Sequence, residues 1–77
     1  MGLTLTASTG AKIDIWRDAD VFVARPADQS IEPQVCLGVD LFEVIAELAG
    51  LQLDDRSQAA EAVKLARDAQ RRLDHAG

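Results

Sequence analysis

The fold is decided by the stretch KIDIWRDADVFVA, which spans residues 12–24. Apolar and polar side chains alternate over 12–16, and an apolar run follows over 21–24. Between them, residues 17–20 are charged or small and break the pattern. Alternation with a period of two is typical of a strand that buries one face. Two such runs joined by a short polar break predict a β-hairpin.

The strand pattern extends to both sides of this hairpin. On its N-terminal side, leucine alternates with threonine up to a turn signal that ends in Gly10. On its C-terminal side, Pro26 stops the strand because its ring removes a backbone donor and holds the preceding residue extended. A polar loop and the short apolar run 35–39 follow. The sequence therefore predicts antiparallel strands at 2–7, 12–17 and 21–25, and a fourth if 35–39 pairs as well.

Beyond these strands the spacing of apolar residues changes to that of helices. Asp40 and Glu43 stand at the positions of a capping box, in which each side chain bonds to the backbone of the other residue. Gly50 stands where a left-handed residue ends a helix. These signals predict a helix over 41–49, and a longer helix near 56–74 follows.

Each predicted helix has an apolar side. The first helix is expected to pack on Leu5, Ile13 and Ile15 through Leu41, Val44, Ile45 and Leu48. The second helix begins after Asp54 or Asp55, either of which can cap it. Its expected core side consists of Ala59, Ala62, Val63, Ala66, Ala69 and Leu73.

These elements predict an α+β fold, a small antiparallel three- to four-stranded sheet followed by two α-helices packed on one face. The chain has 77 residues. We expect a single domain over 1–77, strand-rich over 1–39 and with a helical pair over 40–75. A chain of this size buries only about 60% of its unfolded surface, which suffices for one core and no deep substrate cleft.

The hairpin has two alternative registers. With the loop Asp18-Ala19, Ile15 lies opposite Phe22, and Trp16 shares a face with Val21 and Val23. With a loop one residue longer, Ile15 lies opposite Val23 and Trp16 opposite Phe22. Both registers place large apolar side chains on both faces of the sheet, while the two helices can cover only one face.

The uncovered face is where we expect the functional site. Trp16 lies on the opposite pleat from Ile13 and Ile15, and tryptophan is enriched among residues that carry binding energy. We predict that Trp16 binds a partner together with three acidic residues, Asp14, Asp18 and Asp20. The alternative is that the loop 26–34 folds over Trp16 and buries it as ordinary core.

The charge of the chain is unevenly distributed. The net charge is −5; residues 1–47 hold eight Asp or Glu and three Lys or Arg, and residues 48–77 hold five of each. This balance disfavours a surface that attracts phosphate. The single cysteine excludes an intramolecular disulfide, which suits a reducing cytoplasm. No apolar run approaches the roughly 18–20 residues of a membrane span.

Few side chains suit catalysis or metal binding. A nucleophile would have to be Cys36 or a serine with His75 as its base, but His75 lies near the end of a helix that is expected to fray. Catalytic groups must be held rigidly. Asp14, Asp18 and Asp20 lack the ligand spacing and the glycine of a calcium loop. We therefore expect no catalytic residue, no metal site and no cofactor.

A basic stripe runs along the second predicted helix: Lys64, Arg67, Arg71 and Arg72. Glu61 lies three residues before Lys64, and Asp68 lies three and four residues before the two last arginines. This is the spacing of intrahelical ion pairs. The pattern favours helix-stabilising pairs over phosphate contacts.

The C-terminal half resembles a known family of DNA-binding proteins. The run 35–39, the helix 41–49 and the segment Arg56-Ser57-Gln58-Ala59 together resemble a ribbon-helix-helix regulator. In that family the strands of two subunits pair and read DNA. The resemblance implies a DNA-facing strand surface formed by Gln34, Cys36 and Gly38, and this surface contains no Lys or Arg.

The sequence favours a non-enzymatic, acidic protein-binding module in the cytoplasm. Its profile is similar to that of inhibitors or antitoxin-type proteins that bind a larger, basic, nucleic-acid-handling partner, such as the anti-CRISPR proteins of phages. One alternative is a structural or assembly subunit that forms a homodimer through the open sheet face. A second is a ribbon-helix-helix-like DNA-binding regulator. We expect a basic protein partner and no direct contact with nucleic acid or membrane.

Overall fold

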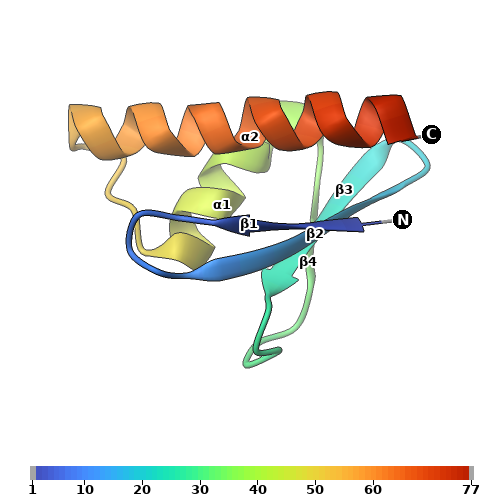
Figure 1. The fold of residues 1–77 in the computed structure, drawn as a ribbon, viewed down its shortest axis with the longest axis horizontal. Coiled ribbons are helices and arrows are strands. Elements are labelled where there is room, and N and C mark those ends of the chain that lie inside the picture. Colours follow the sequence, from blue (N-terminus) through green and yellow to red (C-terminus); the bar gives the residue numbers. More distant parts are fainter. Residues whose placement is uncertain (1, 77) are drawn as a thin grey trace.

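The structure is a computed structural model that describes residues 2–76. It contains, in chain order, β1 (Gly2–Thr6), β2 (Lys12–Asp18), β3 (Val21–Pro26), β4 (Gln34–Cys36), the 3-10 turn η1 (Gly38–Asp40), α1 (Leu41–Ala49) and α2 (Arg56–Ala76). The strands form one antiparallel sheet in the order β1-β2-β3-β4 (Figure 1). This confirms the α+β class and a fourth strand, which spans 34–36 and not 35–39, because the chain enters η1 at residue 38.

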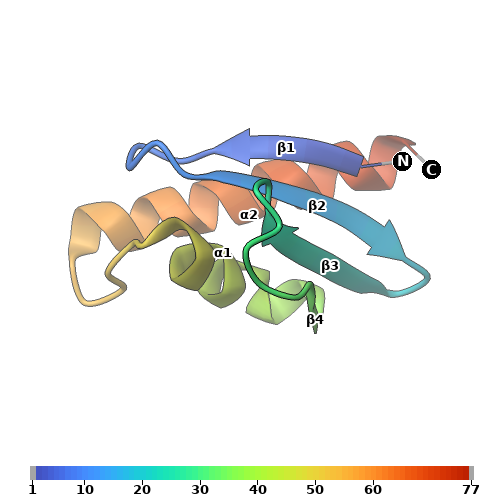
Figure 2. The ribbon, with the colours of Figure 1, turned by 90° about the horizontal axis from the view of Figure 1, so that it is seen from below.

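The two helices form a second layer on one face of the sheet. α2 runs along β1 and β2, whereas α1 packs against β2, β3 and β4 (Figure 2). Between the layers, Ile13 and Ile15 of β2 meet Leu41 and Ile45 of α1, and all four side chains are fully buried. The predicted core is therefore confirmed at its centre, whereas Val44 and Leu48 at its margin are only partly buried.

α2 contributes mostly alanine to the core. Its buried residues are Ala62, Ala66, Ala69 and Leu73. Ala59 and Val63 are only partly buried, and Leu65, which the sequence pattern did not single out, packs against the core. Alanine lets the helix approach the sheet closely but removes little apolar area from water, so α2 stabilises the fold less per residue than α1.

The β2–β3 loop corrects both predicted registers. The loop is Ala19-Asp20, so Ile15 lies opposite Ala24 and Trp16 opposite Val23. Ala19 has φ 57°, because a two-residue hairpin matches the twist of its strands only with a left-handed residue in the loop. The first register was nevertheless right about the faces, since Trp16 does share a face with Val23.

The helix ends follow the sequence signals with one exception. Gly50 has φ 73° and ends α1 as expected. Asp55 caps α2, because its Oδ1 accepts the backbone N–H groups of Ser57 and Gln58 at 3.0 and 3.1 Å. The capping box at Asp40 was wrong. The turn η1 already gives Asp40 helical angles (φ −99°, ψ −3°), and its side chain makes no capping bond.

Candidate functional site

The face of the sheet opposite the helices carries most of the predicted site. Side chains alternate along a strand, so the strand registers settle which residues share this face. Their side chains are those of Thr4, Thr6, Lys12, Asp14, Trp16, Asp18, Val21, Val23, Arg25 and Val35, and we call them the open face. Trp16 lies opposite Val23, which lies opposite Val35. An apolar row therefore crosses three strands.

Trp16 is half-buried at one end of this row. The guanidinium carbon of Arg25 lies 5.3 Å from the centre of the Trp16 ring, within the range of a cation–π contact. A shallow cavity of about 280 Å³ beside the ring is lined by residues of β1, β2 and β3. Trp16 is thus partly accessible, and Arg25 lies over its ring.

The three predicted acidic residues differ in their surroundings. Asp14 accepts a hydrogen bond from the Thr4 hydroxyl at 2.8 Å and lies 3.9 Å from Arg25 Nε. Its charge is therefore partly compensated by Arg25, whose buried Nε makes no hydrogen bond in the described part of the chain. Asp18 is exposed on the open face, and Asp20 is exposed in the hairpin loop. These two carboxylates are accessible to a basic partner.

Exposed apolar side chains gather at β4 and its flanks. Of the large apolar residues that are exposed in the described part of the chain, four lie within 31–39, and we call them the apolar edge: Ile31 at 50%, Val35 at 65%, Leu37 at 54% and Val39 at 76% exposed. The sequence analysis missed this feature. The signal was present, because every second residue from 31 to 39 is apolar, but Pro33 interrupts the strand pattern.

The apolar edge lies in the acidic part of the protein. Residues 18–47, which run from the end of β2 into α1, contain seven Asp or Glu and one Arg, a net charge of −6. The whole chain carries −5, so the remaining residues sum to +1. We call residues 18–47 the acidic half. The net negative charge of the protein therefore comes from the same stretch of chain that contains the apolar edge.

The basic stripe on α2 is paired differently from the prediction. Glu61 does not serve Lys64 but binds the β1–β2 turn: its Oε2 accepts the Ser8 N–H at 2.7 Å, and its Oε1 accepts the Ser8 hydroxyl. These bonds lower the pKa of Glu61. Asp68 forms the expected pairs, with Arg71 at 2.7 Å and with Arg72 at 3.3 Å.

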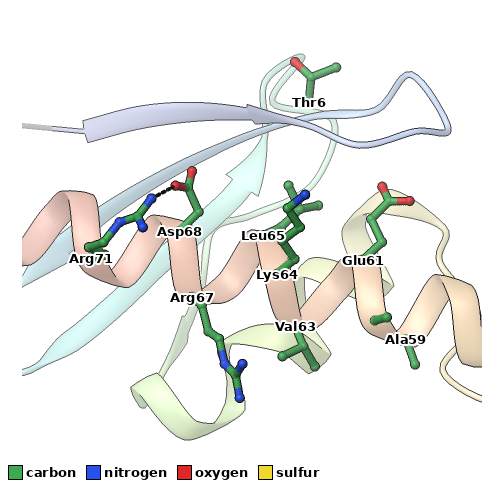
Figure 3. A pocket seen from close by; sticks show the side chains of 10 residues that line it. Thr6, Ala59, Glu61, Val63, Lys64, Leu65, Arg67, Asp68 and Arg71 are labelled. Carbon is green, nitrogen blue, oxygen red and sulfur yellow. Dashed lines mark hydrogen bonds and ion pairs between the residues drawn. The ribbon is translucent and has the colours of Figure 1, made fainter.

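An open groove of about 890 Å³ follows α2 beside Thr6. In Figure 3, Glu61 and Asp68 point toward β1, whereas Val63 and Arg67 point to the opposite side of the helix. A binding site for a small molecule needs polar groups that converge on one point. The diverging side chains do not provide such a point, so this groove is not a candidate substrate site.

The side chains that carry chemistry are poorly placed for it. Burial, and secondarily the nearby carboxylate of Asp40, raise the pKa of the Cys36 thiol, and a thiol held protonated is a weak nucleophile. His75 is exposed near the end of α2. Within residues 2–76, no group of three His, Cys, Asp or Glu is arranged to hold a metal ion. No helix in this range is long and apolar enough to cross a membrane.

Comparison with protein-family models, with curated proteins and with solved structures gives no significant match. The features that bear on function are therefore the open face, the apolar edge and the acidic half.

Proposed function

We propose that the protein is a non-enzymatic binding module of the inhibitor or antitoxin type, which docks on a larger, basic, nucleic-acid-handling protein. One observation carries this proposal: the apolar edge lies within the acidic half. Exposed apolar surface of this kind marks protein contacts, and negative charge around it complements a surface built to hold phosphate.

The site combines an anchor with steering charges. Trp16 supplies a large, half-buried aromatic surface with Arg25 over its ring. Asp18 and Asp20 lie exposed at the hairpin end of the same strand. Such carboxylates accelerate association with a basic partner, and this effect weakens as salt screens the charges.

The two alternatives have less support. Gln34 and Cys36, which the ribbon-helix-helix resemblance would turn toward DNA, share a face with Ala24 and Phe22 on the side that the helices cover. β4 also pairs with β3 of its own chain. A homodimer through the open face would bring together two chains that each carry a net charge of −5, which costs electrostatic free energy, although the charges on the open face itself balance.

Differential capture tests the proposal. The immobilised protein is incubated with nuclease-treated extract of its own host cell, beside the variants Trp16→Ala and Asp18→Asn/Asp20→Asn. Leu53→Ala, which changes an apolar residue that is 41% exposed outside the site, is the matched control. We expect a basic protein to be retained by the parent and the control, and released by salt.

Affinity and stability then separate a binding role of Trp16 from a packing role. Trp16→Ala should weaken binding of the captured partner by more than about 1 kcal/mol, while the melting temperature of the variant hardly changes. Equal affinity of Trp16→Ala and the parent, or a partner whose binding does not respond to salt, contradicts the proposal. A salt-dependent mobility shift with DNA alone would favour the regulator instead.

A further inference from the structure

The two edges of the sheet are built differently. β1, at one end, presents Thr4 and Thr6 toward the open face, and its following turn is tied to α2 through Ser8 and Glu61. β4, at the other end, pairs with β3 on one side only. Natural proteins protect such edges with charged side chains or with very short strands. β4 is short, but it carries no charge, and its outward side chain Val35 is 65% exposed.

The residues around β4 indicate which strand would fit beside it. Val35 continues the row formed by Trp16 and Val23, so a fifth strand would extend this row with its own side chain. Leu37, next to β4, is also extended (φ −78°, ψ 160°) and 54% exposed. Apolar side chains at alternate positions of an added strand would therefore meet apolar neighbours.

The charges around β4 indicate which kind of strand could bind beside it. Glu32 and Asp40 flank β4 on its two sides in the sequence, and both are exposed. The acidic half to which the strand belongs carries −6. A second copy of the chain would place another charge of −6 against it, whereas a segment with lysine or arginine would neutralise it.

We propose that β4 is a docking edge to which an extended segment of the partner, alternating apolar residues with Lys or Arg, adds as a fifth strand. This inference rests on the proposed function, because it specifies how the basic partner is held. Backbone hydrogen bonds supply part of the affinity, and the apolar edge with its flanking carboxylates supplies the preference for sequence.

Synthetic peptides test this inference without knowledge of the partner. The probe is a fluorescently labelled peptide that alternates lysine and valine. Its first control has the same sequence with alternate backbone amides N-methylated, which keeps the side chains and the charge but cannot complete a ladder of hydrogen bonds. Its second control replaces lysine with glutamate. We expect the probe to bind with a Kd of about 1 mM or tighter, and both controls to bind much more weakly.

Variants of the protein locate the contact. Val35→Lys should lower the affinity for the probe about tenfold or more, because it places a positive charge at the centre of β4, where it repels the lysines of the probe. Leu53→Lys, at an exposed apolar residue outside the apolar edge, should leave the affinity for the probe unchanged. Circular dichroism of Val35→Lys should match that of the parent, since position 35 is largely exposed. Amide hydrogen exchange should slow at residues 34–36 when the probe binds.

Several results would overturn the inference: no binding at about 1 mM, equal binding of the N-methylated peptide, or an unchanged affinity of Val35→Lys. A dimer in sedimentation that Val35→Lys dissociates would also overturn it, because a second copy would then occupy β4. If the peptides fail while capture still depends on Trp16, the docking edge is wrong and the proposed function stands. If capture itself fails, the proposed function is wrong.

Discussion

Replacing Ile45 by alanine is the sharpest test of how the two layers hold together. Ile45 has no exposed surface and packs in the cluster that contains Ile13 and Ile15. The change removes three buried carbon atoms, at about 0.8 kcal/mol each, or about 2.4 kcal/mol. The cavity that remains raises the expected loss to roughly 3–4 kcal/mol, within the range measured for such substitutions.

This loss is large for so small a domain. At roughly 0.05–0.15 kcal/mol per residue, a chain of 77 residues has a free energy of unfolding of about 4–12 kcal/mol. Urea unfolding, followed by circular dichroism and by the fluorescence of the single tryptophan, should show a midpoint lowered by roughly 3 M at a slope near 1 kcal/mol/M. Leu53→Ala, at a residue 41% exposed, is the control and should change the free energy by less than about 0.5 kcal/mol. A loss below about 1 kcal/mol for Ile45→Ala, with an unchanged slope, would refute this account of the core.

Three further predictions concern the ends of helices and one carboxylate. Gly50→Ala should lower the free energy of unfolding by about 1 kcal/mol in urea titration, because alanine is strained at φ 73°; an unchanged midpoint would contradict this. Asp55→Ala should cost about 1 kcal/mol through loss of the cap, whereas Asp54→Ala, one residue earlier, should cost little, and equal losses would show that Asp55 does not act as the cap. Bonds from Ser8 hold the pKa of Glu61 below its ordinary value of 4.5, so this carboxylate stabilises the fold above that pH, and its contribution is lost as the pH falls through the folded pKa. Unfolding measured at a series of acidic pH values should therefore show a shallower decline for Glu61→Gln than for the parent, and identical profiles would count against the Ser8 contact.

Local signals in the sequence were enough for the elements of the fold. The alternation around Ile13 and Ile15 is a property of consecutive residues, and so are the stop at Gly50 and the cap at Asp55. The first two appear in the structure as predicted, and of the two possible caps, Asp54 and Asp55, the structure uses Asp55. The open face could be predicted for the same reason. Alternation places Trp16 and Ile15 on opposite faces of the sheet, and the helices cover the face of Ile15.

Features that depend on distant contacts could not be predicted. Glu61 bonds to Ser8, far away in the chain, in preference to the lysine one turn further on. The hairpin register depends on Ala19 accepting a left-handed conformation, for which an alanine gives no signal. The apolar edge was missed because an alternating pattern predicts a strand but does not show whether another segment of the chain covers its apolar side chains.

The position of α2 has a consequence for the synthesis of the protein. This last helix lies along the first strand, and the start of β1 is beside the end of α2 in both views (Figures 1 and 2). Contacts from both ends of α2 reach the strands and their connection: Glu61 bonds to Ser8 in the β1–β2 turn, and Asp74 pairs with Arg17 of β2. While a ribosome is still translating residues 56–76, the strands made first have one apolar face without its cover. The domain therefore completes its fold only after the final helix has emerged, and a nascent chain arrested before Arg56 should expose β1 and β2 to chaperones.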